Sequence, residues 1–144
     1  MENKSSVTSS IKKEISCLSS ITAGCRYCEA HETRAAERYG SSQERLENIW
    51  EYKSHEAFSE LDRAMFDLAI VASQFPNGVS KEIKARAEKF FNEGEIIKIL
   101  GVVALFGYLN SWNDSLGTEL ENPAEKSAEK ILGTNEWEAV KHFC

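Results

Sequence analysis

The residues with the clearest chemistry stand together in the segment Gly24-Cys25-Arg26-Tyr27-Cys28-Glu29-Ala30-His31. If a helix starts at Cys25, both cysteines and His31 share one face, because side chains three residues apart are neighbours on a helix. Cys25 would then lie in the first turn, where free backbone N–H groups and the helix dipole favour a thiolate. His31 lies one turn beyond Cys28 and can accept or relay its proton. This spacing predicts a redox-active dithiol assisted by a histidine.

The same three side chains could instead pack as ordinary core residues or bind zinc. A closed zinc site needs a fourth ligand, and no second CxxC or HxxxH pattern follows in the sequence. The thioredoxin fold is disfavoured, because no strand precedes the motif and no βαβ pattern surrounds it. We therefore expect neither a bound metal ion nor a cofactor.

The other cysteines and histidines have less specific surroundings. Cys17 is predicted to be a core residue, whereas Cys144 ends the chain and is expected to be exposed. His55 and His142 stand among polar residues, which is typical of surface histidines. A set of acidic residues at helical spacing is expected to form a solvated face: Glu29, Glu32 and Glu37. Glu32 could in addition orient the histidine of the motif.

The charge of the chain disfavours nucleic acid and membrane surfaces as partners. The 144 residues carry a formal net charge of −6 with a pI near 5.2, so no basic surface is available for phosphates. The polar N-terminal segment lacks the apolar stretch of a secretory signal. The uncharged run from Ile99 to Trp112 has 14 residues, fewer than the ~20 that a membrane span needs. We expect a cytoplasmic protein whose cysteines stay reduced.

The hydrophobic spacing predicts a single all-α domain over 1–144, with 1–7 disordered and 134–144 as a C-terminal tail. Capping signals at Ser41, Ser59 and Asn122, and a helix stop at Gly40, set the boundaries. Seven helices are expected, at 8–23, 25–39, 42–52, 59–74, 80–91, 93–119 and 123–132. The segment 96–109 is apolar on nearly every face, which predicts a central, buried helix.

Several segments together resemble the AhpD-like (carboxymuconolactone decarboxylase) family, in its alkylhydroperoxidase-type branch with a CxxC pair. They are GCRYCEAH, the FSELDRA helix, SQFPNGV and ALFGYLNSWND, and the resemblance runs from Ile11 to Glu121. It implies an AhpD-like multihelical bundle that assembles into trimers or hexamers. It also implies a CxxC pair that reduces hydroperoxides and is re-reduced by a dithiol donor such as a lipoyl group. Cys28 matches the thiol that attacks the peroxide, and Cys25 matches the resolving thiol. The polar end of the apolar helix, with Asn110, Trp112 and Asn113, is a recurrent feature of the family.

The motif departs from the peroxidase pattern at two places. That pattern has three residues between the second cysteine and the histidine, whereas this chain has two. It also has a glutamate at the position of Lys13, and Glu14 comes one residue late, about 100° round a helix. Glu14 is therefore a weak candidate for the acid of the proton relay.

These observations predict an oligomeric peroxidase or thiol–disulfide oxidoreductase with Cys28, Cys25 and His31 as catalytic residues. His31 one turn away favours Cys28 as the attacking thiol, whereas the first-turn position favours Cys25. Two alternatives stay open. One is a small-acid decarboxylase or isomerase that uses His31 with a carboxylate. The other is a catalytically inactive assembly protein of the same fold.

Overall fold

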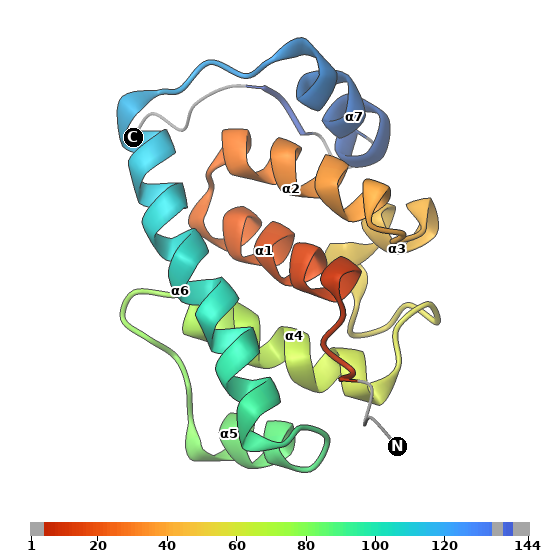
Figure 1. Ribbon diagram of the computed structural model, residues 1–144, viewed down its shortest axis with the longest axis vertical. Helices are drawn as coiled ribbons and strands as arrows, with labels where there is room; N and C mark the ends of the chain where they lie inside the picture. Colours follow the sequence, from red (N-terminus) through yellow and green to blue (C-terminus); the bar gives the residue numbers. More distant parts are fainter. Residues whose placement is uncertain (1–4, 134–136, 140–144) are drawn as a thin grey trace.

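The structure, a computed structural model, describes residues 5–133 and 137–139, and within them it contains helices and no strand (Figure 1). This confirms the predicted all-α fold. The elements follow in the order α1 (Ser9–Ala23), α2 (Arg26–Arg38), α3 (Gln43–Glu47), a 3₁₀ turn η1 (Ile49–Glu51), α4 (Glu60–Ala72), α5 (Lys81–Glu88), α6 (Glu93–Leu116) and α7 (Asn122–Leu132).

The helices begin close to the polar residues that predict them. At α4 the capping box is complete, since the Ser59 hydroxyl accepts the Asp62 N–H and the Asp62 carboxylate accepts the Ser59 N–H. At α3 the cap is Ser42 and not Ser41, because the hydroxyl of Ser42 is the one that reaches the third N–H of the helix. At α7 the cap is Glu121 and not the predicted asparagine, which becomes the first helical residue. Pro123 lies in the first turn of α7 with either cap, and its missing backbone N–H costs nothing there. A helix start at either position is therefore compatible with the sequence.

Helix α1 lies at the centre of the molecule, between α2 and α4 and alongside α6 (Figure 1). Every residue from Glu14 to Ser20 is buried. Its apolar side contributes Ile15 and Leu18 to the main core, together with Met65 and Phe66 of α4. A second, smaller core joins α2, α3 and α7.

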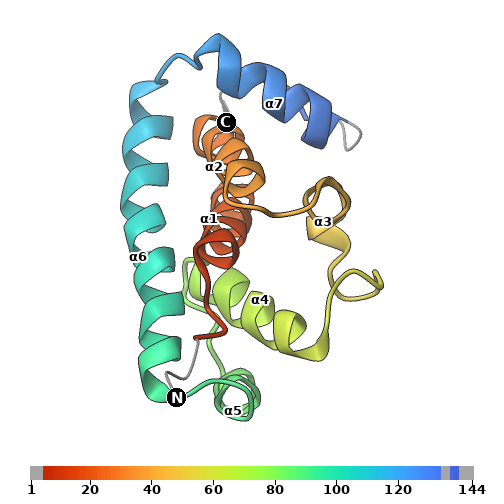
Figure 2. The ribbon, with the colours of Figure 1, turned by 45° about the vertical axis from the view of Figure 1, so that its right-hand side comes forward.

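The prediction that 96–109 forms a buried central helix is wrong. Helix α6 runs along one edge of the molecule, with the other helices on one side only (Figure 2). Ile99, Val103 and Phe106 enter the core, but a row of large apolar side chains is exposed: Ile97, Leu100, Leu105, Tyr108, Trp112 and Leu116. The sequence of a helix that is apolar on every face does not indicate which face packs against the rest of the subunit. For α1 the opposite error arose, because its serines are not typical of a central, buried helix.

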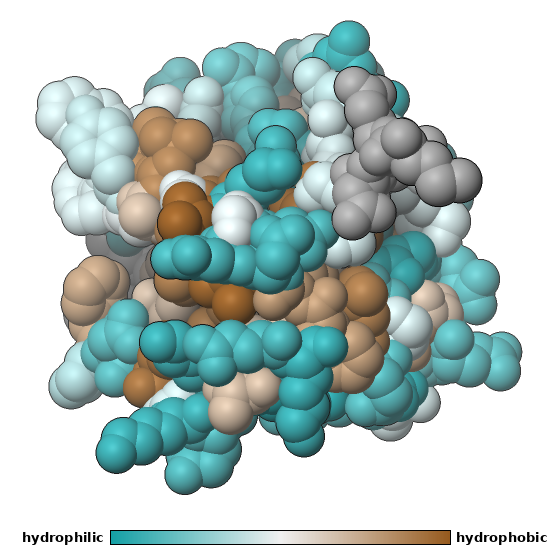
Figure 3. Space-filling view, turned by 60° about the horizontal axis from the view of Figure 1, so that its bottom comes forward, coloured by the Kyte–Doolittle hydropathy of each residue, from teal (hydrophilic) through white to brown (hydrophobic). Residues whose placement is uncertain are grey.

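Hydrophobic side chains are also exposed at the end of the molecule that carries α5 and the start of α6 (Figure 3). Of the helices in the described residues, α6 alone is long and apolar enough to cross a membrane. It nevertheless contributes Ile99 and Val103 to the main core, and Ile96 and Val102 pack against that core.

Residues 5–7, the last part of the segment expected to be disordered, make contacts in the structure. The Ser6 N–H donates to Glu95 at 3.0 Å, and Val7 is buried in the main core. These contacts tie the segment to the start of α6. Residues 1–4 of the expected disordered segment, and 134–136 and 140–144 of the expected tail, lie outside the described residues.

Candidate functional site

Cys25 occupies the N-cap of α2. Gly24 ends α1 in the left-handed conformation, with φ of 73°, and turns the chain directly into α2. The Cys25 sulfur accepts the backbone N–H of Cys28 at 3.4 Å, as a serine or threonine oxygen does in an ordinary cap. A sulfur in this position faces the positive end of the helix dipole, which stabilises a thiolate.

The two thiols have opposite electrostatic environments. The Cys28 thiol donates a hydrogen bond to the Cys25 sulfur, and this bond lowers the pKa of Cys25 against the effect of burial. The same hydrogen bond, with burial second, raises the pKa of Cys28. Both cysteines are buried and neither forms a disulfide in this structure. Of the two sulfurs, Cys25 is therefore the one at which the negative charge of a thiolate is favoured.

Asn113, from the last turns of α6, holds the second cysteine from the other side. Its Nδ2 lies 3.7 Å from the Cys28 sulfur and 3.0 Å from the Leu109 carbonyl oxygen. The Thr118 hydroxyl donates to Asn113 Oδ1 at 3.0 Å, so the amide presents its N–H₂ side to the sulfur. The hydrogen bond from Asn113 opposes the rise in the pKa of Cys28. Asn113 therefore lies at the dithiol.

The other two residues of that polar helix end lie elsewhere. Trp112 is exposed and stacks on Tyr108, with ring centroids 6.2 Å apart. Asn110 is buried, and neither atom of its amide group has a hydrogen-bond partner in the described part of the chain.

A cavity of about 390 Å³ adjoins the dithiol. Its walls are the first turn of α2, the end of α6, the 117–120 loop and Glu125 of α7. Of the two cysteines, Cys25 is the one that lines it. A small molecule in this cavity would therefore meet the sulfur whose pKa is lowered.

His31 lies on the predicted helix but faces the start of α7. Its Nε2 lies 2.7 Å from Glu121 Oε2, and its ring contacts Tyr27 with centroids 4.5 Å apart. The Tyr27 hydroxyl donates to the other oxygen of Glu121 at 3.4 Å. Among the described residues, no hydrogen bond joins His31 to either sulfur. The imidazole thus links α2 to the loop that forms one wall of the cavity.

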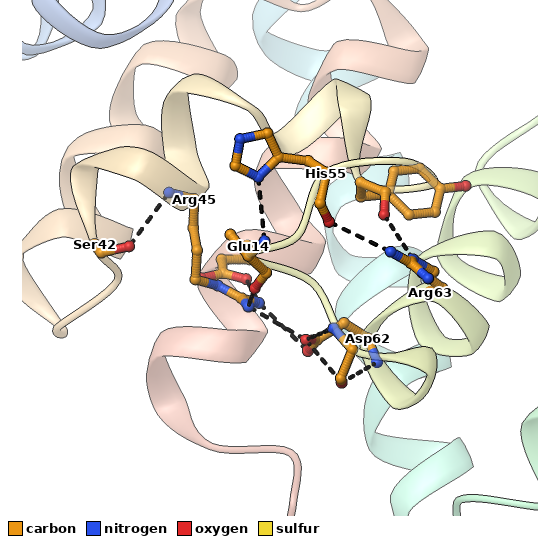
Figure 4. Close-up of polar contacts among 9 residues, drawn as sticks. Glu14, Ser42, Arg45, His55, Asp62 and Arg63 are labelled. Carbon is orange, nitrogen blue, oxygen red and sulfur yellow. Dashed lines mark hydrogen bonds and ion pairs between the residues drawn. The ribbon is translucent and has the colours of Figure 1, made fainter.

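Glu14 belongs to a different cluster, shown in Figure 4. Its carboxylate accepts two hydrogen bonds from Arg45, at 2.7 and 3.1 Å, and is almost fully buried. The same guanidinium binds Asp62 and the Ala57 carbonyl oxygen. Both oxygens of Glu14 are engaged by Arg45, which gives this carboxylate a structural partner instead of a sulfur.

Comparison with known proteins identifies the fold. No family model and no curated protein sequence matches the chain. Among solved structures, the debrominase Bmp8 without ligand matches with a TM-score of 0.81 and 26% identity, over 86% of this chain and 67% of that one. A protein of unknown function from Agrobacterium tumefaciens, proposed to be the antioxidant defence protein AhpD, matches with a TM-score of 0.72 and 16% identity, over 76% of each chain. The chain has the AhpD-like fold.

A third match concerns a bound ligand. A cysteine-to-alanine variant of Bmp8 in complex with 2,3,4-tribromopyrrole superposes with a TM-score of 0.82 and 25% identity, over 86% of this chain and 66% of that one. The chain therefore spans about two thirds of the length of the Bmp8 chains. The resemblance to the AhpD-like family that the sequence predicts is confirmed at the level of the fold.

The two positions at which this chain departs from the peroxidase pattern lie next to each other in the structure. Lys13 stands where the pattern has glutamate, and Glu32 stands where it has histidine. These two side chains form an ion pair, with Lys13 Nζ 3.1 Å from Glu32 Oε2. The Ser16 hydroxyl donates to the same oxygen at 2.5 Å. The two positions are in contact across α1 and α2, but the charges are reversed.

The expected solvated face of α2 is wrong for Glu29 and Glu32, which are 1% and 8% exposed. Glu29 accepts hydrogen bonds from Trp137 Nε1 at 2.7 Å and from Arg26 at 3.1 Å. Sequence reasoning missed Trp137, because a lone indole in a segment without periodicity gives no signal. Glu37 is the member of the set that remains near the surface, where Lys130 lies 3.4 Å away.

The remaining candidates are structural or lie outside the described residues. Cys17 is a core residue, as predicted, and burial raises its pKa to about 12. His55 is half-buried and accepts the Ala57 N–H at its Nδ1. His142 and Cys144 lie outside the described residues. Within the described ranges, no three His, Cys, Asp or Glu side chains are placed to hold a metal ion.

Proposed function

We propose that this protein is a thiol–disulfide oxidoreductase in which Cys25 attacks an electrophilic substrate and Cys28 resolves the product. The proposal depends mainly on one observation, the Cys25 sulfur at the N-cap of α2, hydrogen-bonded by Cys28 and lining a cavity. The AhpD-like neighbours, which include a debrominase, support an enzyme. The roles of the two cysteines are the reverse of those implied by the resemblance to the peroxidases.

Hydroperoxides are the first substrate class that we propose. The Cys25 thiolate attacks one peroxide oxygen, the O–O bond breaks, and the leaving alkoxide takes up a proton to become an alcohol. Cys25 is then a sulfenic acid. The Cys28 sulfur attacks it, an S–S bond forms, and the hydroxyl leaves as water with the Cys28 proton. Two electrons have passed from the two thiols to the peroxide.

A dithiol donor, of which a lipoyl group is one example, then restores the site. Its thiolate attacks the Cys25–Cys28 disulfide, and a second exchange releases the oxidised donor and two reduced cysteines. This cycle needs a reducing compartment, so we propose that the protein works in the cytoplasm.

Organobromine compounds are a second substrate class, favoured by the two Bmp8 matches, which have higher TM-scores than the AhpD match. The same dithiol can reduce an aryl bromide. The Cys25 thiolate takes the bromine, the aryl carbanion takes a proton, and Cys28 displaces bromide as the disulfide forms. The balance is two thiols and an aryl bromide giving a disulfide, an arene and hydrogen bromide.

Thiol counting tests the proposal and separates its two substrate classes. The reduced protein is mixed with one equivalent of tert-butyl hydroperoxide or of a brominated pyrrole, and free thiols are counted before and after. We expect the loss of two thiols with the preferred substrate and a Cys25–Cys28 disulfide in the peptide map. Cys17→Ala is the control, and it should lose the same two thiols. If neither reagent consumes the pair, the redox function is wrong and a non-redox member of the fold is favoured.

We also propose that the exposed face of α6 joins copies of the chain into a homo-oligomer, a trimer or a hexamer. Its row of large apolar side chains is the kind of patch that an interface covers. Light scattering at micromolar concentration should give a mass well above 16.2 kDa, the mass of one chain. A monomer throughout a dilution series would refute the assembly.

A further inference from the structure

The wall of the cavity beside Cys25 is strongly acidic. Asp114 at the end of α6, Glu119 in the following loop and Glu125 in α7 all line it. Asp114 and Glu125 are half-buried, so water screens their charges less than it screens those of fully exposed side chains. Within the described part of the chain, no ion pair or side-chain hydrogen bond engages these three carboxylates. Asp114 is also close enough to Cys25 to oppose the lowering of its pKa.

Among the described residues that line the cavity, Arg26 has the one basic side chain, and it does not balance this charge. Arg26 Nη1 lies 3.1 Å from Glu29 Oε2, and that carboxylate is buried. The Arg26 charge is therefore compensated locally, and the three carboxylates leave the cavity with a negative potential.

The aromatic side chain of the wall is suited to the same kind of ligand. Tyr27 lines the cavity, and its hydroxyl donates to Glu121, whose other carboxylate oxygen contacts His31. The face of a tyrosine ring attracts cations, and anions are disfavoured there. Charge and aromatic surface thus favour the same class of small molecule.

We propose that this cavity selects reaction partners that carry a positive charge, such as aminothiols as electron donors, and disfavours carboxylate-bearing ones. The inference deepens the proposed function, on which it rests for the role of Cys25. An aminothiolate would attack the Cys25 sulfur of the disulfide, the S–S bond would break, and Cys28 would leave with the electron pair and take up a proton. A second aminothiolate would attack the mixed disulfide, which releases the symmetrical disulfide of the donor and the Cys25 thiolate.

Alkylation of the reduced protein tests this selection without any turnover. Three reagents of different charge are compared: (2-bromoethyl)trimethylammonium, iodoacetamide and iodoacetate. The rate at Cys25 is measured by peptide mapping, and each rate is divided by that of the same reagent with 2-mercaptoethanol. At ~0.01 M salt, where charges act over ~30 Å, we expect the normalised rate of the cationic reagent to exceed that of the anionic one at least ~tenfold. At ~1 M salt, where the screening length is ~3 Å, the ratio should fall toward one.

Charge variants test whether the three carboxylates cause the preference for the cationic reagent. Asp114→Asn, Glu119→Gln and Glu125→Gln combined should remove most of the preference, whereas Glu129→Gln, one turn further along α7, should keep it. A ratio near or below one at low salt, or a ratio that the triple variant leaves unchanged, would overturn the inference. If the triple variant does not fold, the salt dependence of the unmodified chain decides alone. Because alkylation needs only a thiolate, a protein that fails to reduce peroxides or bromides can still show the selection, so the two failures are distinguishable.

Discussion

Two clusters of buried ionisable side chains, one around Arg45 and one at the dithiol, differ in how completely their members are paired. Around Arg45, the guanidinium binds Glu14, Asp62 and the Ala57 carbonyl oxygen, and it lies over the Phe58 ring at 4.6 Å (Figure 4). At the dithiol, the Cys25 sulfur has a backbone N–H at 3.4 Å and the Cys28 thiol, and its remaining side faces a cavity.

Completeness of pairing separates a buried charge that is structural from one that is available for chemistry. The Arg45 cluster satisfies its charges with one another, so a new ligand would have to break ion pairs to enter. The Cys25 sulfur accepts weak, long hydrogen bonds and lines a space that a small molecule can fill. Complete pairing favours stability, and incomplete pairing next to a cavity favours reactivity.

The largest effects on activity should come from the dithiol. Cys25→Ser and Cys28→Ser should each lower turnover of the preferred substrate by about 10³-fold or more, because one thiol cannot form the intramolecular disulfide. Turnover is measured with a dithiol donor, and circular dichroism checks the fold. Cys17→Ala is the matched control and should stay within about twofold, since that thiol is remote from the cavity and packed in the core. Full activity in both serine variants would remove the dithiol from the mechanism.

The largest effect on stability should come from the other cluster. Arg45→Met should lower the free energy of unfolding by about 3–5 kcal/mol, because it leaves two buried carboxylates without their partner. Urea unfolding measures this, and Arg38→Met at the exposed end of α2 is the control. The folded fraction of the variant should retain the thiol reactivity of the unmodified protein. A loss of that reactivity at unchanged stability would contradict the division of roles.

The same cluster sets a pH dependence of stability. Although burial opposes it, the hydrogen bonds from Arg45 hold the pKa of Asp62 below its ordinary value of 3.8. A carboxyl whose pKa is lowered on folding contributes stability above its unfolded pKa and loses it as the pH falls through the folded value. We therefore expect the unfolding free energy to fall below about pH 4, and to fall less steeply in Asp62→Asn.

A smaller effect should sharpen the account of the dithiol. Asn113→Leu removes the amide hydrogen bond to the Cys28 sulfur and should slow disulfide formation about five- to tenfold, the effect of ~1 kcal/mol. Stopped-flow measurement of the sulfenic acid lifetime checks this. Ser111→Ala, on the same helix but away from the sulfur, should leave the lifetime unchanged. If Asn113→Leu has no effect either, the hydrogen bond at 3.7 Å contributes nothing.

The smallest expected effect is at His31. Its partner Glu121 is solvent-exposed, and ion pairs of this kind on the surface are weak. His31→Gln should therefore slow turnover no more than about fivefold. A loss of about 10²-fold or more would show that the imidazole acts as a proton-transfer group, as the sequence suggested.

The sequence predicted the helices well because their signals are local. Capping boxes and glycine stops depend on residues three or four apart, and the observed helix starts differ by at most about one residue from the predicted ones. The sequence placed Cys25 in the first turn of this helix, and the structure places it one position earlier, at the N-cap.

Burial and long-range contacts were harder to predict. The acidic residues of α2 look solvated in the sequence, yet Glu32 meets Lys13 from α1 and Glu29 meets Trp137, which is 108 positions away. The prediction for α6 failed for a related reason, because apolar composition does not indicate which face of a helix packs against its neighbours. Such features depend on how helices pack, which no local pattern encodes.

We assign the reactive thiolate to Cys25 and not to Cys28. The most direct measurement is labelling with iodoacetamide to low extent over a range of pH, with peptide mapping to separate the two sites. The account predicts that Cys25 is labelled first, with a half-maximal rate at a pH below 9.0, the ordinary pKa of the thiol, and that Cys28 stays protected. Earlier labelling of Cys28, or two equal titrations near 9.0, would contradict it.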